Sequence, residues 1–171
     1  MAKIIMITGG QRSGKSVFAE KMALELSENP VYVASAMVFD DEFRHRVEVH
    51  QARRGPQWTN FEEPLYPSTL PLEGRTVLLD CLTLLATNTL FDKQEDASEA
   101  LSQLKSEIDA LKALKDTTII IVTNEIGLGG VSENALQRKF TDLQGSINQY
   151  VAEIAEEVYF VISGIKLKIK G

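Results

Sequence analysis

Residues 3–20, KIIMITGGQRSGKSVFAE, constrain the fold of this chain more than any other stretch. The apolar run at residues 4–7 predicts a short buried strand, and the segment that begins at residue 14 predicts a helix. Between them lies Gly9-Gly10-Gln11-Arg12-Ser13-Gly14-Lys15-Ser16, which matches the pattern G-x-x-x-x-G-K-[ST]. A strand before this pattern and a helix after it form the setting in which such a loop binds phosphate.

The residue types in this loop suit an anionic ligand. Gly9 and Gly14 allow backbone angles that turn several N–H groups toward one anion. The N-terminus of the following helix adds partial positive charge at the same place. Lys15 can reach the β- and γ-phosphates of a nucleotide, and the hydroxyl of Ser16 can ligate Mg²⁺. The loop therefore predicts a site for a nucleoside triphosphate and Mg²⁺, against the alternative of a glycine-rich turn that matches by chance.

Length and composition limit the class of protein. The chain has 171 residues, which predicts one domain over residues 1–171. Cys81 is the only cysteine, so no internal disulfide can form, and we expect a reducing, cytoplasmic setting. We expect no signal peptide and no membrane segment, because no apolar run approaches the roughly 18 residues that a membrane helix needs. The net charge of −6 disfavours a broad nucleic-acid surface.

Strands and helices alternate along the chain, which predicts an α/β fold with a doubly wound, mostly parallel sheet. Beyond the first strand, we expect strands at residues 31–34, 75–80, 117–123 and 158–163, with a short edge strand at 58–63. The expected helices cover residues 14–26, 39–54, 96–115 and 134–157, and another begins near Leu82. On the first helix, one side carries Phe18, Met22, Ala23 and Leu26. The basic tail with Lys166, Lys168 and Lys170 predicts a solvated strand or chain end.

Two strand ends carry residues with alternative interpretations. The second strand ends in Ala34, Ser35 and Ala36, whose small side chains either leave room for a ligand above the sheet edge or form a tight turn. Asp80 ends a buried strand, where a carboxylate can hold Mg²⁺ or can cap the following helix. The phosphate loop upstream favours the metal role. Cys81 is expected to be a small buried neighbour rather than a nucleophile.

His50 lies on the expected helix at residues 39–54, with arginines near it. These are Arg46, Arg53 and Arg54. A neutral imidazole can attack a phosphate while guanidinium groups neutralise the oxygens that gain charge. However, Phe43 and Val47 precede His50 at helical spacing, which would make His50 the polar end of a core stripe. Spacing alone favours the second interpretation.

Several stretches together resemble one family, the bifunctional adenosylcobinamide kinase / adenosylcobinamide-phosphate guanylyltransferases of cobalamin biosynthesis. The resemblance rests on ITGGQRSGKS, YVASA, DDEFRHRVEVHQARR, LLDCLTLLATN, VTNEIGLGGVSEN and VYFVISGIKLKIK. These stretches span nearly the whole chain and are far more specific than the phosphate loop alone.

The resemblance implies a RecA-like P-loop NTPase fold, a homotrimer, Mg²⁺, and ATP and GTP as co-substrates. It implies phosphorylation of adenosylcobinamide, followed by transfer of GMP through a covalent adduct on the histidine of R-x-x-x-H, here His50. The resemblance thus reverses the preference for a core role of His50. The implied guanosine contacts are Ala34, Ser35, Ala36, Gln51, Ala52, Arg53, Arg54, Glu62 and Asp80, and the implied metal ligands are Ser16 and Asp80.

Other functions remain open from the sequence alone. One is a single-activity P-loop kinase that acts on a small metabolite without guanylyl transfer. Another is a non-catalytic, nucleotide-binding regulatory assembly. No residue stands out as the general base of a kinase step, which is tolerable because phosphoryl transfer depends mainly on positioning.

Overall fold

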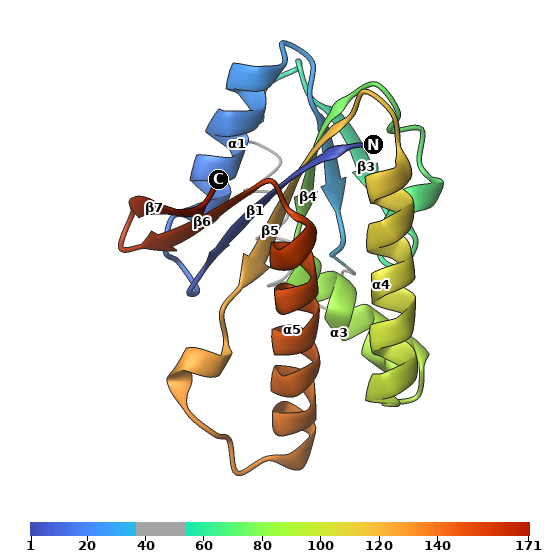
Figure 1. Ribbon diagram of the computed structural model, residues 1–171, viewed down its shortest axis with the longest axis vertical. Coiled ribbons are helices and arrows are strands. Elements are labelled where there is room, and N and C mark those ends of the chain that lie inside the picture. The colour runs from blue at the N-terminus through green and yellow to red at the C-terminus, as the bar shows by residue number, and fades with distance from the viewer. Residues whose placement is uncertain (37–53) are drawn as a thin grey trace.

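The computed structural model describes residues 1–36 and 54–171, and these residues form one seven-stranded sheet in the order β3-β2-β4-β5-β1-β6-β7 (Figure 1). The strands are β1 (Lys3–Gly9), β2 (Val31–Ala34), β3 (Thr59–Glu62), β4 (Thr76–Asp80), β5 (Thr118–Asn124), β6 (Glu157–Ile162) and β7 (Ile165–Lys170). Every neighbouring pair is parallel except β6 and β7. The expected mostly parallel α/β sheet and the expected edge strand, β3, are confirmed.

Helices cover both faces of this sheet (Figure 1). They are α1 (Lys15–Leu26), α3 (Leu82–Asp92), α4 (Ala97–Ala113) and α5 (Ala135–Ile154), with 3-10 turns η1 (Pro67–Thr69) and η2 (Gly127–Gly129). Alternate residues of the central strands enter two cores. Ile4 and Met6 of β1 pack in the core with α3, α4 and α5, whereas Ile5 and Ile7 pack in the core with α1. Continuous apolar runs such as IIMI are therefore required, because both faces are buried.

The strand order places β5 between β1 and β4. Because these three strands are parallel, their carboxyl ends meet at one edge of the sheet. That edge receives the loop after β1, Asp80 at the end of β4, and Asn124 at the end of β5. This strand order thus gathers the predicted functional groups at a single edge.

The side of α1 that carries Phe18, Met22, Ala23 and Leu26 is buried only in part. The structure buries Lys15, Ala19 and Ala23, leaves Phe18 half-buried and exposes Leu26. Two alanines face the sheet, and their small side chains let the helix lie close to it. The larger residues therefore lie at the flank of the helix, where Phe18 packs edge-on against Tyr159 of β6 at 5.3 Å between ring centroids.

The helix predicted at residues 134–157 ends earlier, at Ile154. The backbone N–H of Glu156 donates to the Ile4 carbonyl at 3.0 Å. The Glu156 carboxylate in turn accepts from the Ile4 N–H at 2.7 Å. These two hydrogen bonds between Glu156 and Ile4 of β1 therefore end the helix, and β6 begins at Glu157. This long-range contact is invisible to helical periodicity.

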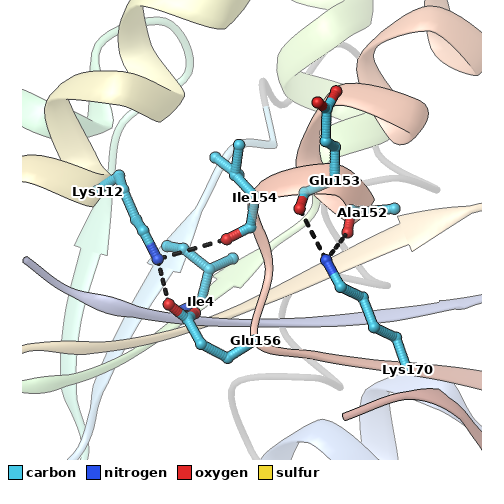
Figure 2. Close-up of polar contacts among 7 residues, drawn as sticks. All are labelled: Ile4, Lys112, Ala152, Glu153, Ile154, Glu156 and Lys170. Atoms are coloured by element: carbon cyan, nitrogen blue, oxygen red, sulfur yellow. Dashed lines mark hydrogen bonds and ion pairs between the residues drawn. The ribbon is translucent and has the colours of Figure 1, made fainter.

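Lysines from two other elements stabilise the exposed carbonyl end of α5 (Figure 2). Lys112 of α4 donates to the Ile154 carbonyl at 3.4 Å. Lys170 of β7 donates to the carbonyls of Ala152 at 2.8 Å and Glu153 at 2.7 Å. Positive charge at this end of a helix also offsets the helix dipole. The basic tail is therefore a solvent-exposed strand, as predicted, but Lys170 is tied to α5. Among the described helices, none is both long and apolar enough to cross a membrane.

Candidate active site

The loop between β1 and α1 requires glycine at two positions. Gly14 has a φ of 94°, in the left-handed region that other residues rarely adopt. At Gly9, an added Cβ would lie 2.5 Å from the Val161 carbonyl oxygen and 2.8 Å from the Ser13 hydroxyl oxygen. The glycine spacing of the motif therefore follows from backbone conformation at one end and from close packing against β6 at the other.

The Lys15 side chain lies inside this loop. Its Nζ donates to the Gly10 carbonyl at 3.0 Å. Burial lowers the pKa of Lys15, and the neighbouring Cys81 and Asp80 partly oppose that effect. The ammonium group is thus partly desolvated, which strengthens its interaction with an incoming phosphate. Gln11 and Arg12 are exposed at the tip of the loop, and Ser16 is half-buried in the first turn of α1.

Two contacts that the sequence did not reveal support the loop from outside. The Gly164 N–H, in the turn between β6 and β7, donates to the Ser13 carbonyl at 2.8 Å. The Glu125 N–H, just after β5, donates to the Gly9 carbonyl at 3.2 Å. The Ser13 hydroxyl is buried and has no hydrogen-bond partner among the described residues. A nucleotide phosphate is the kind of acceptor that would satisfy such a donor.

Asp80 lies at the carboxyl end of β4 and is half-buried. Its Oδ2 accepts a hydrogen bond from the Tyr32 hydroxyl at 2.8 Å. Burial and the adjacent Asp80 raise the pKa of Tyr32 above its usual range, so the phenol is a neutral donor. The alternative role of Asp80 as a helix cap is not observed, because α3 begins after Cys81 with no side-chain cap.

Cys81 behaves as expected of a small buried neighbour. It is a free thiol within the core that contains α1. Burial, reinforced by Asp80, raises the pKa of Cys81 to about 12. A thiol is a poor nucleophile unless it ionises, so this cysteine is not activated for chemistry.

The donor set at this edge fits Mg²⁺ bound with a nucleotide. Mg²⁺ in such sites takes one or two carboxylates, with phosphates and water completing an octahedron. Asp80 supplies one carboxylate, and Ser16 supplies a hydroxyl at the start of α1, where the nucleotide phosphates would lie. Within residues 1–36 and 54–171, no group of three or more His, Cys, Asp or Glu residues could hold a metal by itself.

The small-residue turn after β2 lies beside Asp80. Ala34 is in register with Asp80 on one side and with Glu62, at the end of β3, on the other. The Ser35 N–H donates to the Asp80 carbonyl at 3.2 Å. Asn88 of α3, which sequence reasoning did not single out, donates to the Ser35 carbonyl at 2.7 Å. The structure therefore brings these predicted contact residues together, and the backbone of the turn is held by its neighbours, with Ala36 half-buried.

The segment predicted to carry the nucleophile lies almost entirely outside the described residues. This is true of His50, Gln51, Ala52 and Arg53, so the structure does not test their roles. Arg54 is described. Its guanidinium carbon lies 3.4 Å from the centroid of the Tyr32 ring, and its Nε donates to Asn60 at 3.2 Å. Arg54 thus stacks on Tyr32, the residue whose hydroxyl donates to Asp80.

A buried polar cluster fixes the end of β5. Its members are Thr123, Gln144 and Asn148. The Gln144 amide donates to Thr123 Oγ1 at 2.9 Å and to Asn148 Oδ1 at 2.8 Å, and the Asn148 amide donates to the Asn124 carbonyl at 3.0 Å. The Asn124 N–H is also held, by Thr83 Oγ1 of α3 at 2.9 Å. The strand end between the phosphate loop and Asp80 is therefore rigidly anchored.

A family model described as "Cobinamide kinase / cobinamide phosphate guanyltransferase" matches residues 5–169. This chain belongs to that family. The "Bifunctional adenosylcobalamin biosynthesis protein CobU" of Escherichia coli (strain K12) is 38% identical over 98% of this chain and 99% of its own length. The "Bifunctional adenosylcobalamin biosynthesis protein CobP" of Pseudomonas aeruginosa is also 38% identical, over 97% of this chain and 96% of its own length.

Solved structures support the fold alone. The P4 protein from bacteriophage phi6, in complex with ADP, matches 96% of this chain with a TM-score of 0.51 and 13% identity, over 52% of its own length. At that identity the match shows the fold and nothing about substrates. The match agrees with the mostly parallel α/β fold. The family model and the curated relatives, by contrast, confirm an enzyme of the kinase and guanylyltransferase type.

Proposed function

We propose that this chain catalyses two successive reactions in cobalamin assembly. It phosphorylates a hydroxyl of adenosylcobinamide with ATP or GTP, and then transfers GMP from GTP to that phosphate, giving adenosylcobinamide-GDP. The observation that carries the proposal is the juxtaposition of a glycine-rich loop, Lys15 and Asp80 at one sheet edge, in a chain whose full-length relatives are named bifunctional.

The first reaction uses the phosphate loop. The substrate hydroxyl attacks the γ-phosphate, the bond between the β–γ bridging oxygen and the γ-phosphorus breaks, and the nucleoside diphosphate leaves. Lys15 exchanges its contact with the Gly10 carbonyl for phosphate oxygens, and the loop N–H groups bind the same charge. Ser16 and Asp80 would hold Mg²⁺, which when bound would neutralise the charge that develops on the phosphate oxygens. The chain contributes positioning and electrostatic stabilisation rather than covalent chemistry.

The second reaction uses His50. A neutral ring nitrogen attacks the α-phosphate of GTP, a P–N bond forms, and pyrophosphate leaves. The phosphate of the first product then attacks this phosphoramidate and releases the histidine. Two easier steps thereby replace one difficult transfer. The arginines close to His50 in the sequence would favour the neutral imidazole if they lie near it, because like charges disfavour protonation. The guanosine contacts would come from residues 34–36 and 51–54, with Glu62 and Asp80.

The chain is short, at 171 residues, and the corrinoid substrate is a large ligand. We infer that adenosylcobinamide lies across a subunit boundary in a homo-oligomer, a trimer by family resemblance. We also infer that the enzyme works in the cytoplasm, in keeping with one unpaired, buried cysteine. No contact with nucleic acid is part of the proposal.

A two-label experiment tests the proposal. The protein is incubated with adenosylcobinamide, Mg²⁺ and GTP that carries ³²P at either the γ- or the α-position. We expect both labels in one corrinoid product, because the γ-phosphoryl group is retained when GMP is added. The γ-label alone would indicate a kinase without guanylyl transfer. Neither label, with nucleotide binding intact, would indicate a regulatory assembly and contradict the proposal.

A further inference from the structure

Tyr32 lies between two groups that the proposed reactions need. It is on β2, its side chain is only 5% exposed, and it belongs to the core that also contains Trp58. Its hydroxyl donates to Asp80 Oδ2 at 2.8 Å. The face of its ring carries the Arg54 guanidinium, with 3.4 Å between the guanidinium carbon and the ring centroid. The Tyr32 side chain therefore contacts two residues with expected roles, Asp80 as a metal ligand and Arg54 as a residue that binds the nucleotide.

The ring of Tyr32 is itself held in place. Trp58 packs edge-on against it, with 6.1 Å between ring centroids and an interplanar angle of 82°. Asn60 then links the two neighbours, because its Oδ1 accepts from Arg54 Nε at 3.2 Å and its amide donates to the Trp58 carbonyl at 3.3 Å. Arg54 and Trp58 are thus fixed to each other as well as to Tyr32.

Arg54 keeps a donor available. Its Nη1 is buried and has no hydrogen-bond partner among the described residues. A buried guanidinium nitrogen without an acceptor is costly, and a phosphate or another anionic group of the nucleotide would satisfy it. The stacking on Tyr32 holds the guanidinium plane, which limits the directions in which that nitrogen can donate.

We propose that Tyr32 is a positioning residue for both phosphate transfers, orienting Asp80 with its hydroxyl and Arg54 with its ring. This inference rests on the proposed function, in which Asp80 holds the metal and residues 51–54 contact GTP. Hydrogen bonds to metal-ligating carboxylates fix their orientation and raise metal affinity.

Two substitutions separate the two roles. Tyr32→Phe removes the hydroxyl and keeps the ring. Tyr32→Leu removes both. Tyr150→Phe is the matched control. The Tyr150 hydroxyl donates to Asp109 on the surface between α5 and α4, so this substitution removes a tyrosine–aspartate hydrogen bond away from the site. Trp58 is the only tryptophan, so its fluorescence shows whether the stack is intact in each variant.

The first measurement is Mn²⁺ affinity in the presence of GDP, followed by electron paramagnetic resonance. Tyr32→Phe should weaken Mn²⁺ binding about tenfold, as loss of such supporting hydrogen bonds commonly does. Asp80→Asn should weaken it further, and Tyr150→Phe should match wild type. Equal affinity in Tyr32→Phe and Tyr150→Phe, with Asp80→Asn impaired, would overturn the proposal while leaving the metal role of Asp80 intact. Wild-type affinity in Asp80→Asn would remove the metal role itself, and the proposal with it.

The second measurement is the rate of GMP attachment to His50 at saturating Mn²⁺. Under these conditions Tyr32→Phe should approach wild type, whereas Tyr32→Leu should be slower by roughly fivefold, since a cation–π contact is lost. Arg54→Gln should slow the reaction similarly. Equal rates in Tyr32→Leu and Tyr32→Phe would contradict the seating of Arg54. No adduct in wild type would instead contradict the guanylyl-transfer half of the proposed function, and with it the role of Arg54.

Discussion

At the scale of single residues, the two glycines at the start of the phosphate loop differ sharply. A Cβ at Gly9 would meet the Val161 carbonyl oxygen at 2.5 Å, whereas a Cβ at Gly10 would have no atom within 4 Å. Gly9→Ala should therefore lower the free energy of unfolding by about 1–3 kcal/mol, in the range of other overpacking substitutions. Gly10→Ala should change it little. Urea denaturation of both variants measures the difference, and equal stabilities would contradict the close packing of the loop against β6.

Glu157 supplies a pH-dependent contribution to stability. Lys3 lies 2.5 Å from its carboxylate, Lys168 lies at 3.0 Å, and the Tyr159 hydroxyl donates to it at 2.7 Å. Hydrogen bonds from Lys3, Tyr159 and Lys168 lower the pKa of Glu157 to about 2. A depressed folded-state pKa stabilises the protein above the ordinary glutamate pKa of 4.5, and this stabilisation is lost as pH falls toward 2.

Glu157→Gln should therefore reduce stability by at most about 1 kcal/mol at pH 7, because the group is near the surface. The difference from wild type should shrink as pH falls from 4.5 toward 2. Urea denaturation at several pH values measures it. Glu133→Gln is the control, since Glu133 is exposed and its side chain has no ion-pair partner within the described part of the chain. A difference that grows as pH falls would contradict the lowered pKa.

At the scale of elements, the polar cluster between β5 and α5 should matter for stability more than its size suggests. Asn148→Ala would remove the acceptor of the Thr123 hydroxyl, one of the two acceptors of the Gln144 amide, and the side-chain donor to the Asn124 carbonyl. We expect a loss of about 2–3 kcal/mol, because buried polar groups would be unsatisfied. Ser146→Ala on the same helix is the control, since among the described residues the hydroxyl of the half-buried Ser146 bonds to the Asp142 carbonyl alone. Thermal denaturation measures the difference, and equal melting temperatures of the two variants would contradict this account.

Local sequence patterns predicted the elements well where local forces dominate. Apolar runs such as residues 118–122 identified buried strands, and the loop pattern located the start of α1. The error at the end of the last helix arose from a contact between residues far apart in the sequence. Helical periodicity extended the last helix past Ile154, because it contains no information on the pairing of Glu156 with Ile4.

The position of some site residues could also be predicted from the sequence. The phosphate loop and Asp80 were expected at one edge because they lie at the carboxyl ends of strands in one parallel sheet. Tyr32, Asn88 and Gly164 were missed, since none carries a motif. The role of Tyr32 could have been predicted most readily. A tyrosine within a buried strand requires a hydrogen-bond partner for its hydroxyl, and Asp80 ends the neighbouring strand.

At the scale of the whole molecule, one sheet edge serves both proposed reactions. The phosphate loop and Asp80 lie on one part of it, and the turn at residues 34–36 and Glu62 lie on the other. Tyr32 connects Asp80 to Arg54, which stacks on its ring. An enzyme that first adds a phosphate and then a nucleotide to the same substrate benefits from this proximity. The helices behind the sheet supply the rigidity that holds the two parts in register.

The most direct test of this account is the mass of the intact protein after incubation with GTP and Mg²⁺, for wild type and His50→Ala. We predict that wild type gains the mass of one GMP, in a bond that is labile to acid, and that His50→Ala gains nothing. An adduct on both proteins would move the nucleophile to another residue. No adduct on either would contradict the histidine intermediate and leave a P-loop phosphotransferase as the supported activity.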